Sequence, residues 1–599
     1  MSSEANPNRW DPRERVVFTL SLLFLAPPAI AVLLYSYSPF TLLDRVPKWL
    51  LAISLPFISP ALIATLIFIG NIKEKKRLAE LGAQFPPALP GGKWPGNIDL
   101  IVHFLNVFSN GYVGDTAWIP SEELGGVFDE YVLWSHNLVI TSPEYMKIVL
   151  STDFSNYVKG EKFRSLAFDI LGNGIFNSNG DIWKTHRAMT RPFLTKDRVS
   201  DFEMLDRHAD HAIFKLKERF SSGMAVDFQD LISRFTLDAA TEFLLGSCVD
   251  SLSSELPYPH LAPQAIHANN KTPAEDFSKA FAEAQVTVGR RLRRSILWPL
   301  FEFFKYDTEE PMKVVNAYIE PILRQALERS AVSTTDEKDI DKVGEEETLL
   351  DYLVKHTKDP LVLRDETLNI LVAGRDTTAS TLTFIIYFLS THPEVMTRLR
   401  QEILDRVGSA RRPTYDDIRE MKYLRAVINE TLRLYPPVPI NLRKVVNDTT
   451  WPNPDPTQKP FYVPAGTSVT YSPIVMHRNK RLWGPDAEEF DPDRFLDERL
   501  HKYLVPNPFI FLPFNGGPRI CLGQQFAYNE ISFFIIRLLQ NFTDIELDSQ
   551  AQPEWSKPPA EWKTIAPGRR KGIEKIFPKV HLTLYCHGGL WVKMNEAEK

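Results

Sequence analysis

Cys521 is one of three cysteines in 599 residues, and it lies in the stretch FNGGPRICLG, Phe514–Gly523. An apolar helical pattern runs from Leu522 to Gln540, which places Cys521 at the amino end of a helix. Free backbone N–H groups and the helix dipole favour a thiolate at such a position. The odd number and wide separation of the cysteines argue against a disulfide framework. Cys521 is therefore a candidate metal ligand or nucleophile.

The residues beside Cys521 favour one kind of ligand. Gly516, Gly517 and Gly523 would let a flat, bulky group approach the backbone closely. Arg519 adds a fixed cation. Zinc needs three or four clustered Cys or His ligands, and the sequence has none nearby. Haem iron needs only one axial thiolate, with a cation for its propionates. The alternative is a buried structural cysteine behind a turn.

A second polar motif lies inside a long helical pattern. The run Leu361–Thr391, which Pro393 ends, contains AGRDTT at Ala373–Thr378. Gly374 would leave room for a planar cofactor. Threonine and aspartate at mid-helix compete for backbone hydrogen bonds and can open a local kink. By itself the motif is equally consistent with a polar stripe on a packed helix.

Two residue pairs at helical spacing accompany these motifs. Glu430 and Arg433 lie on one predicted helix face before LYPPVP, and Arg494 follows in FDPDRF. Trp183 and Arg187 are one helical turn apart. Each pair alone is typical of a surface helix. These pairs become informative because they occur in the same chain as the two motifs described above.

Together these motifs resemble those of the cytochromes P-450, the haem-thiolate monooxygenases. The spacing Phe514-x-x-Gly517-x-Arg519-x-Cys521-x-Gly523 matches the haem-binding signature of that family, and the resemblance covers roughly Asp99 to Met594. It implies the cytochrome P-450 fold, mainly α with small β-sheets, and haem b with Cys521 as the axial iron ligand. The implied cofactor-binding residues are Cys521, Arg519, Phe514, Gly517, Gly523, Trp183 and Arg187.

The resemblance also implies roles for residues outside the cysteine motif. Thr377 and Asp376 would be catalytic, as a proton relay for oxygen activation. Three charged residues would lock the cysteine turn in place as structural support: Glu430, Arg433 and Arg494. His186, Arg443 and His477 are weaker candidates for contacts with a haem propionate. The implied substrate-pocket residues are Ile370, Ala373, Val438, Ile440 and Leu590.

Several stretches, among them VAGRDTTAS and FTLDAATEFLLG, look most like the fungal alkane- and fatty-acid-hydroxylating branch of the family. The resemblance implies terminal or near-terminal hydroxylation of a lipophilic chain, with electrons from NADPH through a flavoprotein reductase or a cytochrome b-type donor. Broad oxidation of alkylphenols or polycyclic aromatics is an alternative. So are reductase-independent hydroperoxide rearrangement and a haem sensor or carrier without turnover.

Two uncharged runs near the amino terminus, 16–43 and 49–72, are each long enough to cross a bilayer. We expect two transmembrane helices joined by a turn at 44–48. Basic residues flank both runs: Arg9, Arg13, Arg15, Lys73, Lys75, Lys76 and Arg77. The positive-inside rule therefore places the rest of the chain in the cytosol, at the endoplasmic reticulum membrane. The alternative is one span, with the other run buried or interfacial.

The predicted domain organisation follows from composition. Residues 1–84 form a membrane anchor, 85–97 a Pro/Gly-rich linker, and 98–599 the haem-thiolate catalytic domain. Ser330–Glu347 and Gln550–Lys579 are predicted surface insertions, and short strands are expected at 461–463 and 580–585, the latter followed by a hairpin turn at 587–589. A net charge of −6 without a long basic block argues against nucleic acid as a partner.

Overall fold

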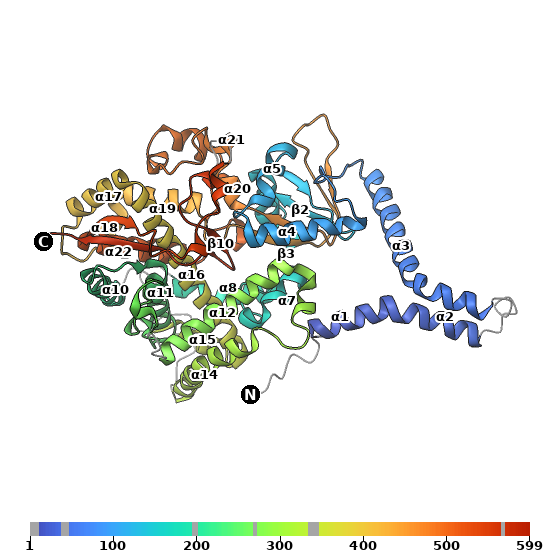
Figure 1. Cartoon of the computed structure of the whole chain (residues 1–599), viewed down its shortest axis with the longest axis horizontal. Helices are drawn as coiled ribbons and strands as arrows, with labels where there is room; N and C mark the ends of the chain where they lie inside the picture. Colours follow the sequence, from blue (N-terminus) through green and yellow to red (C-terminus); the bar gives the residue numbers. More distant parts are fainter. Residues whose placement is uncertain are drawn as a thin grey trace.

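The structure is a computed structural model that describes residues 11–37, 47–194, 202–266, 272–332, 347–564 and 570–598. Helices dominate these residues and small sheets accompany them, which confirms the predicted fold class (Figure 1). The helices are α1 (Pro12–Leu20), α2 (Ala26–Tyr37), α3 (Lys48–Glu80), α4 (Ile98–Asn110), α5 (Asp115–Leu124), α6 (Pro143–Lys147), α7 (Gly160–Leu171), α8 (Gly180–Thr190), α10 (Glu203–Ser221), α11 (Phe228–Leu245), α12 (Pro273–Arg294), α13 (Trp298–Phe301), α14 (Glu309–Val332), α15 (Leu349–His356), α16 (Pro360–Thr391), α17 (Pro393–Arg406), α18 (Tyr415–Glu420), α19 (Lys422–Leu434), α20 (Pro473–His477), α21 (Lys480–Trp483) and α22 (Gln524–Asn541). The strands are β1 (Val127–Asp129), β2 (Asn137–Ile140), β3 (Tyr157–Val158), β4 (Val226–Asp227), β5 (Asn441–Val445), β6 (Thr449–Trp451), β7 (Phe461–Val463), β8 (Ser468–Tyr471), β9 (Phe542–Leu547), β10 (Pro578–Val580), β11 (Leu584–Cys586) and β12 (Trp591–Glu596).

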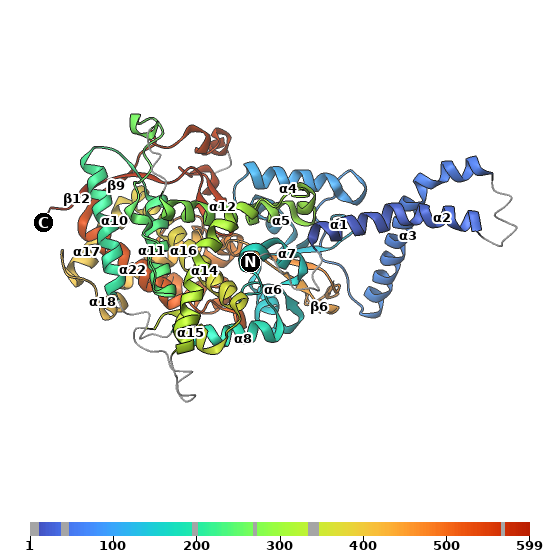
Figure 2. The ribbon, with the colours of Figure 1, turned by 90° about the horizontal axis from the view of Figure 1, so that it is seen from below.

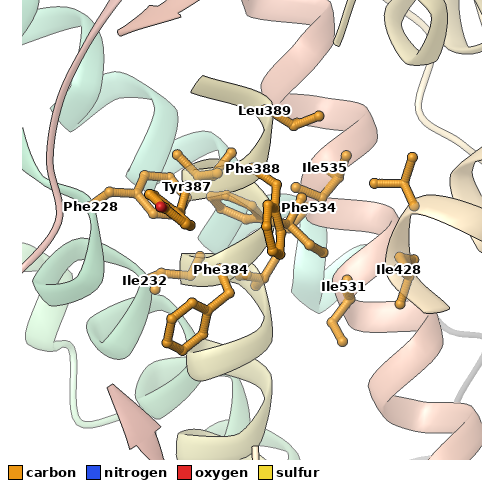
Figure 3. Close-up of a cluster of buried hydrophobic side chains, with 14 of the residues drawn as sticks. Phe228, Ile232, Phe384, Tyr387, Phe388, Leu389, Ile428, Ile531, Phe534 and Ile535 are labelled. Carbon is orange, nitrogen blue, oxygen red and sulfur yellow. The ribbon is translucent and has the colours of Figure 1, made fainter. Parts of the chain in front are cut away.

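Helix α16 forms the centre of the helical core. It begins after Asp359, whose side chain accepts a hydrogen bond from the Leu361 N–H at 2.9 Å, and it ends before Pro393. The prediction of a helix over Leu361–Thr391 is confirmed. Residues 378–389 are all buried, because apolar neighbours surround this half of the helix. Figure 3 shows its side chains packed between those of α11 and α22.

The strands form small sheets at the edge of the helical core. The largest has the order β1-β2-β8-β5-β3, in which β2 and β8 run parallel and the other neighbours antiparallel. The predicted strand at 461–463 is β7, which pairs with β6. A third sheet has the order β4-β12-β9 and joins the end of the chain to α11 and α22.

The predicted turn near the carboxyl terminus is wrong in position. Strands β10 and β11 pair antiparallel, so the chain reverses at 581–583, inside the segment expected to be one strand. Gly588 and Gly589, the expected turn, instead lead from β11 into β12, which belongs to a different sheet. Both have positive φ, 75° and 88°. The Gly-Gly pair marked a change of sheet rather than a hairpin.

Two helical stretches near the amino terminus are long and apolar enough to cross a membrane: Val16–Tyr37 and Lys48–Glu80. They project together from one end of the rest of the chain (Figures 1 and 2). Only 0 % and 6 % of their apolar windows are buried, so neither run is a core helix. Pro56 and Pro60 lie inside α3 without ending it. Residues 38–43 of the first predicted span, and most of the predicted turn, lie outside the described residues.

The Pro/Gly-rich segment after α3 is held against the sheets. Gln84 forms an isolated bridge with Phe461 of β7, and Ala88 forms one with Asp129 of β1. The Leu89 N–H donates to the Asp129 carbonyl at 2.8 Å. Backbone hydrogen bonds therefore fix the direction in which α3 leaves the sheets.

The predicted surface insertion Gln550–Lys579 is only partly at the surface, and its residues 565–569 lie outside the described part. Trp555 is exposed, whereas Arg570 and Glu574 are buried. Arg570 Nε lies 2.9 Å from Glu574 Oε1, and the Glu574 carboxylate also accepts a hydrogen bond from Tyr387 of α16 at 2.6 Å. The polar, Pro-rich composition of this segment does not indicate that it contains a buried ion pair. The other predicted insertion, Ser330–Glu347, lies largely outside the described residues.

Glu574→Ala should destabilise the protein by about 3–5 kcal/mol, because it leaves the Arg570 guanidinium buried without its carboxylate. Denaturant unfolding of the full-length protein in detergent, followed by tryptophan fluorescence, measures this loss. Glu561→Ala, an exposed carboxylate in the same insertion, is the matched control and should stay within about 0.5 kcal/mol of wild type. Equal stability of the two variants would contradict a structural role for the buried pair.

Candidate active site

The loop before α22 holds Cys521 in a defined conformation. Its N–H donates to the Phe514 carbonyl at 3.0 Å, and the Phe514 ring packs on Tyr528 of α22. Gly517 has φ 65°, and a Cβ there would lie 1.7 Å from the Leu150 carbonyl oxygen. This glycine is therefore required by the packing of the loop on residues 148–152.

Cys521 faces a cavity of about 780 Å³, which lies within the range of about 300–1,000 Å³ typical of cofactor pockets. No Cβ contact within 4 Å would arise at Gly523, so space is open beside the sulfur. The cavity is lined by Arg187, Arg191, Pro192, Leu194, Gly517, Pro518, Ile520, Cys521 and Leu522.

Neighbouring groups shift the pKa of the Cys521 thiol in opposite directions. Desolvation raises this pKa, whereas the Gly523 N–H and the Arg187 guanidinium lower it and so favour a thiolate. A metal ion that binds there would displace the proton.

Four cations lie close together beside this cavity: Lys159, Arg187, Arg443 and Arg519. Lys159 and Arg443 both donate to Asn441 Oδ1, each at 3.2 Å. Arg519 donates to the Ser178 carbonyl at 2.8 Å, and its guanidinium lies 4.5 Å from the centre of the Trp183 ring.

None of these four cations forms an ion pair with a carboxylate among the described residues. Burial, and then the charge of Arg443, lower the pKa of Arg519 to about 9 and that of Lys159 well below its ordinary value. Buried charge without a counter-charge is costly, so the cluster fits an anionic ligand. A haem with two propionates and an iron for Cys521 meets both demands. Lys159 lies in no recognised motif, and sequence reasoning missed it.

The predicted support cluster is present and buried. Arg433 Nε lies 2.7 Å from Glu430 Oε2, and Arg494 Nε lies 3.5 Å from Glu430 Oε1. Arg433 also donates to the carbonyl of His477 at 2.7 Å, and His477 Nε2 accepts from the Leu512 N–H at 2.8 Å. These bonds join α19 to the chain that leads into the cysteine loop. Burial lowers the pKa of His477 to about 3, so this residue is a neutral structural link rather than a propionate ligand.

The two predicted relay residues lie in the middle of α16. The Thr377 hydroxyl donates to the Ala373 carbonyl at 2.7 Å. The Asp376 Oδ1 lies 3.2 Å from Arg375 Nη1, and burial raises the pKa of the Asp376 carboxyl. Helix α16 runs through these residues without interruption, so the expected kink is not seen in this structure.

The other predicted contacts are scattered. His186 Nδ1 lies 2.8 Å from Glu366 Oε1 of α16. Ile370 packs on the cluster that includes α12, and Ile440 lines a small cavity of about 20 Å³ between α4, α5 and β10. Leu590 is fully buried in the core and has no surface for a substrate. Its inclusion in the pocket followed from where members of the resembling family contact substrate; Leu582, in the turn between β10 and β11, packs against the same cluster as Ile370.

A helical fold that presents one cysteine to a cavity beside unpaired cations defines a haem-thiolate protein. The family model described as Cytochrome P450 matches residues 95–565. Cytochrome P450 52A6 of Candida tropicalis is 33 % identical over 89 % of this chain and 96 % of its own length. Cytochrome P450 monooxygenase pvhE of Talaromyces variabilis is 37 % identical over 70 % of this chain and 76 % of its own, and Cytochrome P450 52E1 of Candida apicola is 38 % identical over 68 % and 76 %.

The chain belongs to the cytochrome P450 family. The predicted family is therefore confirmed, and with it haem as the cofactor and monooxygenase as the class of enzyme. The roles of the individual site residues stay predictions, which the following variants test.

Cys521→Ala should abolish the carbon-monoxide band of the reduced protein that is characteristic of thiolate ligation, because no other described cysteine lines the cavity. The spectrum of the reduced protein with carbon monoxide, minus that of the reduced protein without it, measures this band. Cys248→Ala removes a cysteine outside the cavity and should keep the band. A band of unchanged position in Cys521→Ala would refute the ligand assignment.

Arg443→Gln should speed the loss of haem to an apo-globin acceptor by about tenfold or more, since a hydrogen bond to a charged group contributes about 1.5–3 kcal/mol. The matched control is Lys444→Gln, the exposed neighbour on β5. Identical rates of haem loss in the two variants would mean that the buried cation does not hold the cofactor.

Proposed function

We propose that this protein is a membrane-anchored monooxygenase that hydroxylates alkanes or fatty acids at or near the chain end. Its electrons come from NADPH through a flavoprotein reductase, and its catalytic part faces the cytosol at the endoplasmic reticulum membrane. The observation that carries the proposal is the Cys521 cavity with its cations, in a chain that also has Asp376 and Thr377 at the middle of α16.

The residues beside the cavity would have two different roles in binding haem. Cys521 holds the iron, and Lys159, Arg187, Arg443 and Arg519 neutralise the propionates. When bound, haem supplies the redox chemistry of oxygen activation, which a thiolate ligand promotes by favouring O–O cleavage.

The chain's own groups would supply the protons. Thr377, whose hydroxyl now donates to a backbone carbonyl, can turn to present that hydrogen to the active site. Asp376, buried beside it, can accept a proton from solvent and pass it on. A retained acid–alcohol pair favours a reductase-dependent monooxygenase over hydroperoxide rearrangement, which has less need of such a relay.

The choice of substrate rests on resemblance and on the membrane. The relatives from Candida carry the designation 52, and the chain's motifs resemble the fungal branch that hydroxylates alkanes and fatty acids. An apolar substrate dissolved in the bilayer is available to an enzyme anchored there.

An exposed apolar patch also supports the membrane placement. Leu300, Phe301, Phe303 and Phe304 follow α12 and are exposed, Phe304 to 95 %. This apolar patch lies at the start of α1, where Arg13 Nη1 donates to the Phe303 carbonyl at 3.4 Å. Exposed aromatic side chains next to a spanning helix fit a surface that touches the bilayer.

The reductase would dock through basic side chains near the cysteine loop. Arg191 lines the Cys521 cavity, and the Arg425 guanidinium lies 3.8 Å from the centre of the Tyr528 ring at the start of α22. Lys184 is exposed on α8, although it pairs with Asp181 at 2.8 Å. An acidic partner surface would complement these cations.

The experiment that tests this function measures NADPH consumption and product with purified reductase and either dodecanoate or an alkane. Substrate-dependent turnover with hydroxylation at or near the chain end is expected. The absence of turnover across a broad panel of alkanes, fatty acids, alkylphenols and polycyclic aromatics would count decisively against a monooxygenase of lipophilic substrates. Turnover of a fatty hydroperoxide without NADPH would favour the rearrangement reaction instead.

Thr377→Ala should keep its haem and its carbon-monoxide band, yet divert most reducing equivalents to hydrogen peroxide, because the relay loses its hydroxyl. The ratio of peroxide to hydroxylated product measures this. Thr381→Ala, one turn further along α16 and bonded to the Thr377 carbonyl, is the control and should remain coupled. Unchanged coupling in Thr377→Ala would remove this residue from the relay.

A further inference from the structure

Three polar side chains meet where α16 packs beside α12. Asp376 and Arg375 come from α16, and Gln285 comes from α12. Arg375 Nη1 lies 3.2 Å from Asp376 Oδ1, and the Arg375 guanidinium lies 5.5 Å from the centre of the Phe281 ring of α12. The contact thus joins the predicted proton-relay helix to the helix that precedes the exposed apolar patch.

All three side chains leave hydrogen-bonding capacity unused inside the protein. Arg375 is 5 % exposed and Gln285 is 1 % exposed. Among the protein groups that the structure describes, Arg375 Nε, Asp376 Oδ2 and both amide atoms of Gln285 have no hydrogen-bond partner of normal geometry. Leaving the hydrogen bond of a buried polar group unmade costs free energy of folding. Several buried polar atoms without hydrogen-bond partners next to a predicted relay residue indicate a role in function rather than in packing.

The surroundings of the Asp376 carboxyl shift its pKa in opposite directions. Burial raises the pKa of the carboxyl, whereas the charge of Arg375 and the nearby Gln285 amide lower it. Gln285 is therefore close enough to Asp376 to stabilise its ionised form, although the amide is not yet in hydrogen-bonding geometry.

The turn between β10 and β11 closes the other side of this cluster. Gly289 of α12 has no side chain there, and a Cβ would lie 2.7 Å from the His581 Cα. Burial, then the charges of Arg375 and Arg293, lower the pKa of His581 to about 4, so its ring is neutral at pH 7. Arg375 is thus the cation that acts on Asp376, and His581 adds no charge.

We propose that Gln285 and Arg375 are positioning residues that hold the Asp376 carboxyl between α12 and α16 and thereby control its proton transfer to Thr377. The inference rests on the proton-delivery role of Asp376 in the proposed function. Held beside a cation and an amide, the carboxylate takes up one proton from solvent. It then releases one proton toward Thr377, so that Asp376 is unchanged after each transfer.

The test compares Gln285→Leu and Arg375→Met in the full-length, haem-loaded protein. Product formed per NADPH is measured against pH, and the part of the profile that Asp376→Asn removes is assigned to this carboxyl. We expect its midpoint to rise by about 1 to 3 pH units in Arg375→Met, since loss of a neighbouring cation raises the pKa of a carboxyl by that much. Gln285→Leu should raise it by less, and Arg375→Lys should restore part of the shift.

A second readout does not depend on turnover. The infrared C=O band of the protonated Asp376 carboxyl, assigned by its loss in Asp376→Asn, should persist to higher pH in Gln285→Leu and Arg375→Met. Thr287→Val is the matched control, because Thr287 is buried on another face of α12 and accepts from Arg290. This variant should leave both the band and the profile unchanged.

The outcomes separate this inference from the function on which it rests. If Gln285→Leu and Arg375→Met keep the carbon-monoxide band and leave both midpoints unmoved, the inference is overturned whatever happens to the rate. If Asp376→Asn itself leaves coupling and its pH profile unchanged, the proton-delivery role fails, and the inference fails with it.

Discussion

Of the four cations beside the Cys521 cavity, Lys159 and Arg443 are buried and Arg187 and Arg519 are half-buried, and none pairs with a carboxylate among the described residues. Elsewhere the chain compensates its own buried charge, as Arg433 does with Glu430 and Arg570 does with Glu574. Because unpaired buried charge is costly, the same physics that makes those pairs structural makes the cavity a site for an anionic cofactor. Cys521 places the predicted metal ligand at the same cavity.

Bonds to distant parts of the chain hold the loop that carries Cys521, the predicted iron ligand. The Glu430–Arg433 pair on α19 is tied by His477 to Leu512, which begins the cysteine loop. Gly517 lets that loop lie directly on the Leu150 carbonyl. The loop is therefore positioned by bonds to distant parts of the chain rather than by its own short-range hydrogen bonds alone.

Helix α16 serves two purposes along its length. Its later half is buried on every side between α11 and α22 and fixes the helix in the core (Figure 3). Its middle carries Asp376 and Thr377, whose hydrogen-bond and ion-pair partners among the described residues lie on α16 itself, while Gln285 of α12 lies close to the Asp376 carboxyl. A firmly packed end thus supports a polar centre with unsatisfied groups.

The sequence by itself determined the family, the cysteine loop and the approximate extents of α16, α22 and β7, because fixed motifs and helical periodicity are local properties. Only the tertiary structure decided how distant charges are compensated: that Lys159 joins the cavity cations, that Gln285 reaches Asp376, and that the Arg570–Glu574 pair is buried. It also moved the carboxyl-terminal turn from Gly588–Gly589 to 581–583, because β12 pairs with β9 and β4 rather than with β11. Neither burial nor strand pairing is a property of a short segment, since each depends on which remote residues pack against it.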